Sequence, residues 1–203
     1  MIVCVKPSIY ELTIKRSRFI SVSRHIDDRE DVKSFIEKLK REHPDARHVC
    51  YGYIADEKGD DFGYDDDGEP SGTAGKPIYS AIAAAGARKT VIAVVRYFGG
   101  IKLGAGGLTR AYRQSAAELI EQAGLARAEK YAEYEVECDN ETYKRAGAVL
   151  RNLNCKVEGI VYNKTVSFTA LAPVACDLSG ALSTIGVAPV KIGEKYVFEE
   201  NEQ

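Results

Sequence analysis

The sequence predicts a mixed α/β protein of two modules, residues 1–126 and 127–203. Apolar residues recur at helical spacing in some segments and at strand spacing in others, and the two kinds of segment alternate along the chain. The second module has the element order βαββαβ, a common split βαβ arrangement. With 203 residues in total, each module has enough chain to bury a core of its own.

The first module begins with a predicted β-hairpin followed by a helix. Alternating apolar residues over 10–25 flank a basic turn, as in a hairpin. Asp27 or Asp28 can cap the helix, and we expect Pro44 to end it. The apolar stripe of this helix has the spacing i, i+3, i+4, i+7 and consists of Val32, Phe35, Ile36 and Leu39.

The rest of the first module predicts two strands and two helices around a long loop. Residues 47–55 alternate as a strand, and the acidic, glycine-rich segment 56–75 is predicted to be a loop of a length that is often functional. Pro77 suits the first turn of a helix. The apolar run 91–95 predicts a strand buried on both faces, and a glycine-rich turn, 99–107, opens the next helix.

The second module has clearer sequence signals for its strands and helices. Glutamates alternate with apolar residues over 133–138, which predicts a half-buried strand. Asp139 or Asn140 can cap the following helix, and Asp177 can cap a second one. The remaining strands are predicted at 156–161, 165–171 and 190–199.

The composition and charge of the chain indicate an ordinary globular protein rather than a membrane-spanning or broadly basic one. Apolar content of 45% and charged content of 29% are ordinary for a globular domain. The net charge is −2, made of +1 for residues 1–126 and −3 for the rest, so any nucleic-acid contact must rest on a local patch. No apolar run approaches the roughly 20 residues that span a membrane. The N-terminal segment 1–7 lacks the organisation of a signal peptide, so we expect a cytoplasmic protein with no membrane partner.

The cysteines do not form a recognisable framework. Their number is odd and no two are close in sequence, which argues against a disulfide scaffold or a zinc ribbon. We expect Cys50, Cys138 and Cys176 to be small buried side chains, because each lies in an apolar pattern. The five are Cys4, Cys50, Cys138, Cys155 and Cys176.

The glycine-rich segment 96–112 is the first candidate for a ligand site. Glycines let a backbone approach a ligand, and the amides that open a helix bind anions, so the segment can cradle a phosphate. The alternative is that the glycines only permit a tight strand-to-helix turn. The standard nucleotide-binding motifs are absent, because neither the Walker A nor the dinucleotide spacing of glycines is met. The candidate residues are Arg96, Tyr97, Gly99, Gly100, Lys102, Gly104, Gly106, Gly107, Arg110 and Arg113.

The acidic segment 65–77 is the second candidate. Its carboxylates can hold Mg²⁺ through oxygen ligands or supply a general base, although the spacing is not that of an EF-hand. The alternative is a solvated acidic loop. The possible metal ligands are Asp65, Asp66, Asp67 and Glu69, and Ser71, Thr73 and Lys76 are further binding candidates.

Arg47 and His48 lie at the start of a predicted strand. His48 is the only histidine inside an apolar strand pattern. It can pair with a carboxylate or a phosphate, or it can be a structural histidine with its hydrogen bonds satisfied.

Three runs resemble the IMPACT/YigZ family: DDDGEPSGTAGKP, VVRYFGGIKLGAGGLTRAY and, upstream, RHVCYGY. The matches span about 14–122. The segment from about 131 to 198 is similar to the small domain that bacterial members append. The resemblance implies a first domain with the ribosomal-protein-S5 domain-2-like fold. It implies a second, ferredoxin-like domain similar to one in translocating elongation factors.

The resemblance also implies a role in translation. We expect a regulatory protein that binds RNA, the ribosome or a translation factor, without sequence-specific DNA binding, a cofactor or an assigned catalytic residue. Eukaryotic members are implied to compete for the activator of a starvation-sensing kinase, but this chain has the bacterial architecture. The alternatives are a Mg-dependent enzyme acting on a phosphate ligand or nucleotide, and a plain protein-interaction module. The RNA and enzyme hypotheses both require segments 65–76 and 96–110 to line one cleft.

Overall fold

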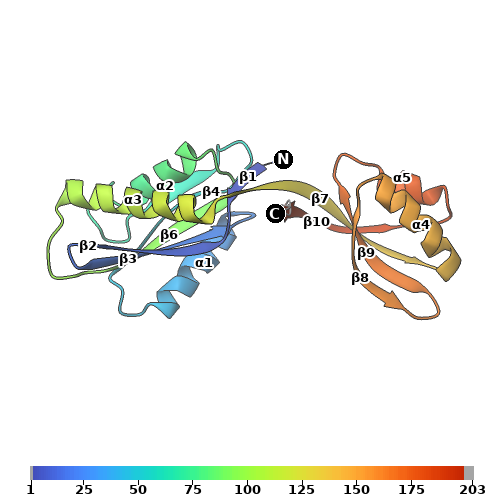
Figure 1. The fold of residues 1–203 in the computed structure, drawn as a ribbon, viewed down its shortest axis with the longest axis horizontal. Helices are drawn as coiled ribbons and strands as arrows, with labels where there is room; N and C mark the ends of the chain where they lie inside the picture. The colour runs from blue at the N-terminus through green and yellow to red at the C-terminus, as the bar shows by residue number, and fades with distance from the viewer. Residues whose placement is uncertain (1, 199–203) are drawn as a thin grey trace. The chain divides into compact units, whose positions relative to one another are not determined.

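The structure, a computed structural model, describes residues 2–198, and Met1 and residues 199–203 lie outside this description. The chain divides into two compact units, Ile2–Arg127 and the residues from Ala128 on. Each unit is an antiparallel sheet with helices packed on it (Figure 1). The predicted mixed α/β class is therefore confirmed.

The sheet of the first unit has five antiparallel strands in the order β2-β3-β6-β4-β5. The predicted hairpin is present as β2 and β3, whose Ile14 and Ser17 pair across the turn. A short strand, β1 (Ile2–Val5), precedes the hairpin. The sheet strands are β2 (Ser8–Ile14), β3 (Ser17–His25), β6 (Thr90–Tyr97), β4 (His48–Ile54) and β5 (Phe62–Asp65).

Helices cover both faces of this sheet (Figure 1). Helix α1 (Arg29–Glu42) packs on one face, and α2 (Gly75–Ala84) and α3 (Ala105–Ala123) pack side by side on the other. Strand β6 lies in the middle of the sheet and contributes alternate residues to the two cores. Its apolar run is continuous because neither face of the strand meets solvent.

The ends of the first-unit helices follow the sequence signals. Asp28 caps α1 by accepting hydrogen bonds from the amides of Glu30 and Asp31. The helix ends at Glu42, two residues before Pro44. Gly124 closes α3 with φ of 70°, a conformation that glycine adopts at little cost.

Two strands of the first unit lie outside the predicted elements. The predicted loop 56–75 contains β5, which pairs with β4 and whose Phe62 and Tyr64 rings lie against Tyr79 of α2. The glycines and acids of this segment hid that strand, since they are rare in strands. Strand β1 is too short for its alternation to stand out.

The second unit has the predicted βαββαβ order, and its four strands pair in the order β10-β7-β9-β8. Asp139 and Asp177 cap the two helices as expected, and both helices lie on one face of the sheet (Figure 1). Strand β7 begins earlier than predicted, at an alanine-rich stretch with weak strand propensity. The elements are β7 (Leu125–Cys138), α4 (Asn140–Asn152), β8 (Lys156–Tyr162), β9 (Val166–Pro173), α5 (Leu178–Ser183) and β10 (Val190–Phe198).

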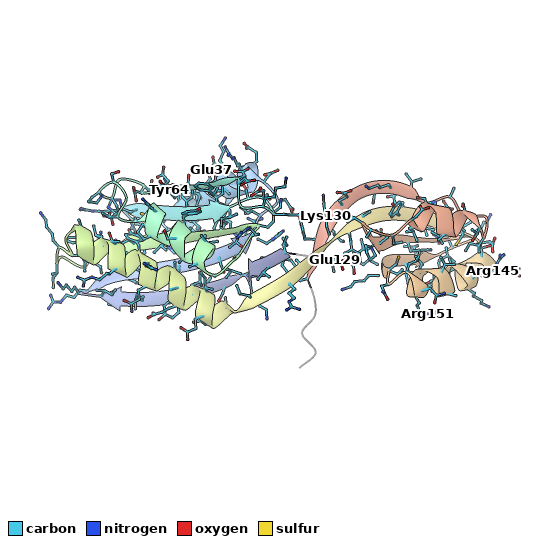
Figure 2. All side chains as sticks on the ribbon, turned by 90° about the horizontal axis from the view of Figure 1, so that it is seen from above. Glu37, Tyr64, Glu129, Lys130, Arg145 and Arg151 are labelled. Atoms are coloured by element: carbon cyan, nitrogen blue, oxygen red, sulfur yellow. The ribbon has the colours of Figure 1, made fainter. Side chains whose placement is uncertain are left out.

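Arg145 and Arg151 project from the exposed side of α4 (Figure 2). No helix within residues 2–198 has the length and apolar character needed to cross a bilayer.

Candidate functional site

A cleft of about 370 Å³ opens in the first unit between the acidic segment and the glycine-rich segment. The structure therefore brings both sequence motifs to one place, together with the start of β4. The residues that line the cleft are Arg47, His48, Glu69, Pro70, Arg96, Phe98, Lys102, Leu103, Gly104, Ala105 and Leu108.

Asp66 organises the acidic segment from within. Its two carboxylate oxygens accept hydrogen bonds from the amides of Gly72, Ala74 and Gly75, at 2.7 to 2.9 Å. Ala74, the residue that precedes α2, has no side chain that can cap the helix. Asp66 therefore caps α2 from a distance in sequence, and its carboxylate stabilises the loop.

Asp67 ties the same loop to its neighbours. One carboxylate oxygen accepts from the amide of Val49, and the other pairs with Lys40 of α1 at 2.6 Å. Asp65 accepts a hydrogen bond from the amide of Asp67. These contacts position the segment that carries Glu69 into the cleft.

Glu69 and Arg96 form a buried ion pair at the base of the cleft. Their side chains are only 4% and 7% exposed. The hydroxyl of Tyr112, on α3, donates to the same Glu69 oxygen at 2.8 Å. Burial, together with Cys50 and Glu69, raises the pKa of Tyr112, so this hydroxyl remains protonated and keeps donating. Glu69 thus ties the acidic segment to Arg96 of β6 and to Tyr112 of α3.

Arg96 has an unusually apolar environment for a cation. Its guanidinium lies 5.5 Å from the ring centre of Phe19 and 5.7 Å from that of Phe98. Its second terminal nitrogen donates to the hydroxyl of Ser17 at 3.5 Å. The Nε of Arg96 is buried and has no hydrogen-bond partner among the described residues.

The N-terminus of α3 forms one wall of the cleft. Gly104 precedes the helix with φ of 71°, and no side chain caps it. The amides of the first helical residues, Ala105, Gly106 and Gly107, have no acceptor within the helix, because no helical carbonyl group precedes them. With the helix dipole, they make this wall electropositive.

His48 presents one defined face to the cleft. Its Nδ1 lies 2.7 Å from the carbonyl oxygen of Asp67, and a carbonyl oxygen only accepts. Nδ1 therefore carries the hydrogen, and Nε2 is the nitrogen left to accept a hydrogen bond. The contact with Asp67 is the structural role that the sequence left open for His48, and its position in the cleft lining leaves pairing with a phosphate as a prediction.

Charge in the cleft is unevenly distributed. Glu69 offsets Arg96, while Arg47 and Lys102 are exposed on the rim. Phe98, 43% exposed, adds an aromatic face beside them. The accessible part of the cleft is thus cationic with one aromatic surface.

Several candidates from the sequence do not line the cleft. Tyr97 points to the opposite face of the sheet, where its hydroxyl contacts His43 at 2.8 Å. Gly99 packs against the hairpin turn, where an added Cβ would lie 2.0 Å from the backbone of Arg16. The others outside the lining are Asp65, Asp66, Asp67, Ser71, Thr73, Lys76, Gly100, Gly106, Gly107, Arg110 and Arg113.

The acidic residues do not assemble into a metal site. The oxygens of Asp66, Asp67 and Glu69 already accept hydrogen bonds from the chain. Within residues 2–198 no three His, Cys, Asp or Glu side chains cluster closely enough to hold a metal ion. These carboxylates act as structural acceptors in the described protein.

Sequence analysis missed the residues that support the cleft from behind. Ser17 and Tyr112 contact Arg96 and Glu69 from positions 79 and 43 residues away in sequence. Cys50 lies buried beside Tyr112, as its apolar pattern predicts, and burial raises the pKa of its thiol. No local pattern connects these residues, so only the fold reveals the network.

Comparison with known proteins places the chain in a family. Residues 15–120 match the model of the Impact N-terminal domain. The protein named IMPACT family member YigZ, from Escherichia coli, is 37% identical over 80% of this chain and 80% of its own. IMPACT family member YvyE, from Bacillus subtilis, is 35% identical over 78% of this chain and 73% of its own.

The chain belongs to the IMPACT family. The predicted resemblance is thereby confirmed. A solved structure described only as a hypothetical protein has a TM-score of 0.62 and 32% identity, and it covers 95% of this chain and 98% of its own. Every residue that lines the cleft lies within the matched Impact N-terminal domain.

The second unit of this IMPACT family protein offers a different surface. Its apolar residues Tyr134, Val136 and Cys138 face α4 and α5, so the alternating glutamates of β7 lie on the opposite face of the sheet. Glu135 and Glu137 line a hollow of about 400 Å³ on that face. We call this surface the acidic sheet face: Glu133, Glu135, Glu137, Glu158, Ser167 and Thr169.

Proposed function

We propose that this IMPACT family protein is a translation-associated regulator that binds single-stranded RNA in the cleft of its first unit and catalyses no reaction there. The observation that carries this proposal is one juxtaposition. The uncapped N-terminus of α3, the rim cations and an exposed aromatic ring all border the same cleft.

Each part of this cleft suits a part of an RNA chain. Helix N-terminal amides and exposed Arg and Lys side chains bind phosphate. An exposed aromatic ring stacks on a base without regard to its identity. Phe98, Lys102 and the start of α3 line the same cleft, so we expect one nucleotide to make both contacts.

The acidic sheet face does not suit the same ligand. Its glutamates would repel phosphate. The chain as a whole carries a net charge of −2, so RNA binding must come from the local charge of the cleft.

The role in translation rests on family membership. The resemblance implies regulation of translation, and the fold alone does not assign an activity. The family model covers the cleft, so the same domain carries both the family signatures and the proposed binding site.

The test is a titration of a fluorescently labelled short single-stranded RNA, followed by anisotropy at several salt concentrations. The double variant Arg47→Glu, Lys102→Glu should weaken binding by at least about tenfold and flatten the salt dependence. The matched control is Arg145→Glu, Arg151→Glu on α4, which makes the same charge change on the second unit (Figure 2). Equal loss in both variants, or no RNA binding even at low salt, would show the proposal to be wrong.

Phe98→Ala separates stacking from charge. Because the ring is 43% exposed, its loss should leave the fold intact. Base stacking is worth about 1–3 kcal/mol, so RNA affinity should fall by roughly tenfold with an unchanged salt slope.

A Mg-dependent enzyme acting on a phosphate ligand remains the second candidate, because His48 and the start of α3 line the same cleft. The engagement of Asp66, Asp67 and Glu69 with the chain speaks against it. A nucleotide-induced rise in melting temperature that requires Mg²⁺ would favour the enzyme over the RNA-binding proposal.

A further inference from the structure

We infer that the RNA path continues from the cleft of the first unit onto the β2–β3 turn, where Lys15 and Arg16 bind the phosphates next to the nucleotide held in the cleft. The inference rests on the proposed function for the position of that nucleotide. It adds two binding residues that lie outside the cleft lining and gives the bound strand a direction.

The β2–β3 turn places two cations in an unfavourable backbone conformation. Lys15 and Arg16 alone join the two strands, so they form a two-residue hairpin turn. Both have positive φ, 45° and 65°, as a type I′ turn requires, and such turns strongly prefer Asn-Gly. The conformation is strained for residues that carry a Cβ. The stability of the turn therefore does not explain why two long cationic side chains occupy it.

Both cations are available to a ligand. Lys15 and Arg16 are exposed, and neither side chain makes an ion pair or a hydrogen bond with another described residue. Arg18, two residues further on, differs because its guanidinium pairs with Glu11 at 2.7 Å. The turn thus presents two positive charges that no described acid offsets, and such charges bind the phosphates of a polyanion.

Gly99 and Ser17 hold the turn beside the cleft. A Cβ on Gly99 would overlap the backbone of Arg16, so the glycine-rich segment and the turn are in direct contact. Ser17 accepts a hydrogen bond from the amide of Gly99 at 3.2 Å and another from Arg96, which lines the cleft. Gly99 directly follows Phe98, the aromatic residue of the lining. The β2–β3 turn and the start of α3 lie at the same end of the first unit (Figure 1).

The cleft is too small for a run of RNA chain. Its volume of about 370 Å³ is at the small end of ligand pockets, so the rest of a bound strand lies outside it. On the side of the acidic segment, the exposed carboxylate of Asp65 repels phosphate. On the side of the glycine-rich segment, Phe98 leads through Gly99 to the turn. The favourable route for the strand is therefore over Lys15 and Arg16.

The double variant Lys15→Asn, Arg16→Gly tests this path without harming the fold. It converts the turn to Asn-Gly, the favoured type I′ sequence, so the melting temperature should stay the same or rise. The probes are labelled single-stranded RNAs of about three to ten nucleotides, followed by anisotropy at several salt concentrations. For the longest RNA, affinity should fall by about tenfold and the salt slope by about 1.4, because each phosphate contact contributes about 0.7. The loss should shrink as the RNA is shortened.

Two further variants separate the turn from general charge. Lys15→Asn alone retains Arg16, so it should lower the salt slope by about 0.7, half the change of the double variant. The matched control is Lys33→Gln, Arg41→Gln, which removes two exposed cations from α1, on the other face of the sheet from α3. This control should leave the salt slope unchanged.

The outcomes distinguish this inference from the proposed function. If the double variant and the parent protein bind every RNA equally, the inference is overturned and RNA binding stands. A loss of the same size at every length, or a matching loss in the α1 control, overturns the inference in the same way. No RNA binding by the parent protein, even at low salt, overturns the proposed function and the inference with it.

Discussion

The cleft of the first unit and the acidic sheet face of the second unit use charge in opposite ways. In the cleft, the ion pair of Glu69 and Arg96 is almost fully buried, while the rim carries Arg47 and Lys102, which form no ion pair with another described residue. On the acidic sheet face, Lys195 bridges Glu133 and Glu158 at 3.1 and 2.9 Å while remaining 37% exposed. Both surfaces have a hollow of similar size.

This difference underlies the proposal that the cleft of the first unit, and not the hollow of the second, binds phosphate. Burial makes the Glu69–Arg96 pair important for stability, since removal of either partner leaves the other charge buried without a counterion. The exposed pairs of the second unit are screened by solvent and contribute little. The two regions should therefore respond very differently to equivalent mutations.

The largest expected effect comes from breaking the buried pair. Glu69→Gln leaves the Arg96 cation without a counterion and should lower the free energy of unfolding of the first unit by about 3–5 kcal/mol. Hydrogen–deuterium exchange of peptides from β6 and α3 measures this for the first unit alone. Lys195→Met in the second unit should cost less than about 1 kcal/mol.

A double variant sharpens that result. Glu69→Met combined with Arg96→Met removes both charges, so it should recover much of the stability lost in Glu69→Gln. If Glu69→Gln and Lys195→Met have equal effects, the distinction between the two regions is wrong.

The next effect compares two aspartates at helix N-termini. Asp66→Asn removes one of the oxygens that serve the amides of Gly72, Ala74 and Gly75, and should cost about 2 kcal/mol. Asp139→Asn should cost only a few tenths of a kcal/mol, because asparagine is an equally good cap. Exchange rates in α2 and α4 report the two effects, and equal protection losses would contradict the remote capping by Asp66.

The smallest effect is a pH dependence confined to the second unit. Lys130 and Lys191 lower the pKa of Glu194 from its ordinary value of 4.5 to about 2. Because the folded pKa lies below the unfolded one, this contribution is present above about pH 4.5 and is lost as the pH falls toward about 2. Thermal unfolding across that range should show a loss that Lys130→Met reduces, and an unchanged profile in the variant would contradict it.

Much of the fold could be predicted from local patterns. The apolar stripe of α1, the continuous run of β6 and the alternation along β7 each reflect the solvent exposure of one element. The caps Asp28 and Asp139 are local as well, because an aspartate reaches amides two or three residues away. Strand β5 escaped prediction since its support, the stacking of Phe62 on Tyr79, is made across the fold.

For the site, the sequence identified the two motif segments and every polar residue of the cleft lining, but not their roles. Asp66 and Glu69 are three residues apart, and both looked like metal ligands. The fold directs Asp66 to the backbone amides of its own loop and Glu69 to Arg96, 27 residues away. Tyr97 and Arg96 are adjacent, but strand alternation sends them to opposite faces of the sheet.

The sequence by itself determined the class of fold, the order of the elements in the second unit, most of those in the first, and the segments that carry the family signatures. These properties depend on periodicity and capping, which act over a few residues. Only the tertiary structure decided which acids are structural, which cations remain available and which helix end stays uncapped. Those outcomes depend on contacts between residues far apart in the chain, and burial then fixes the strength of each charge.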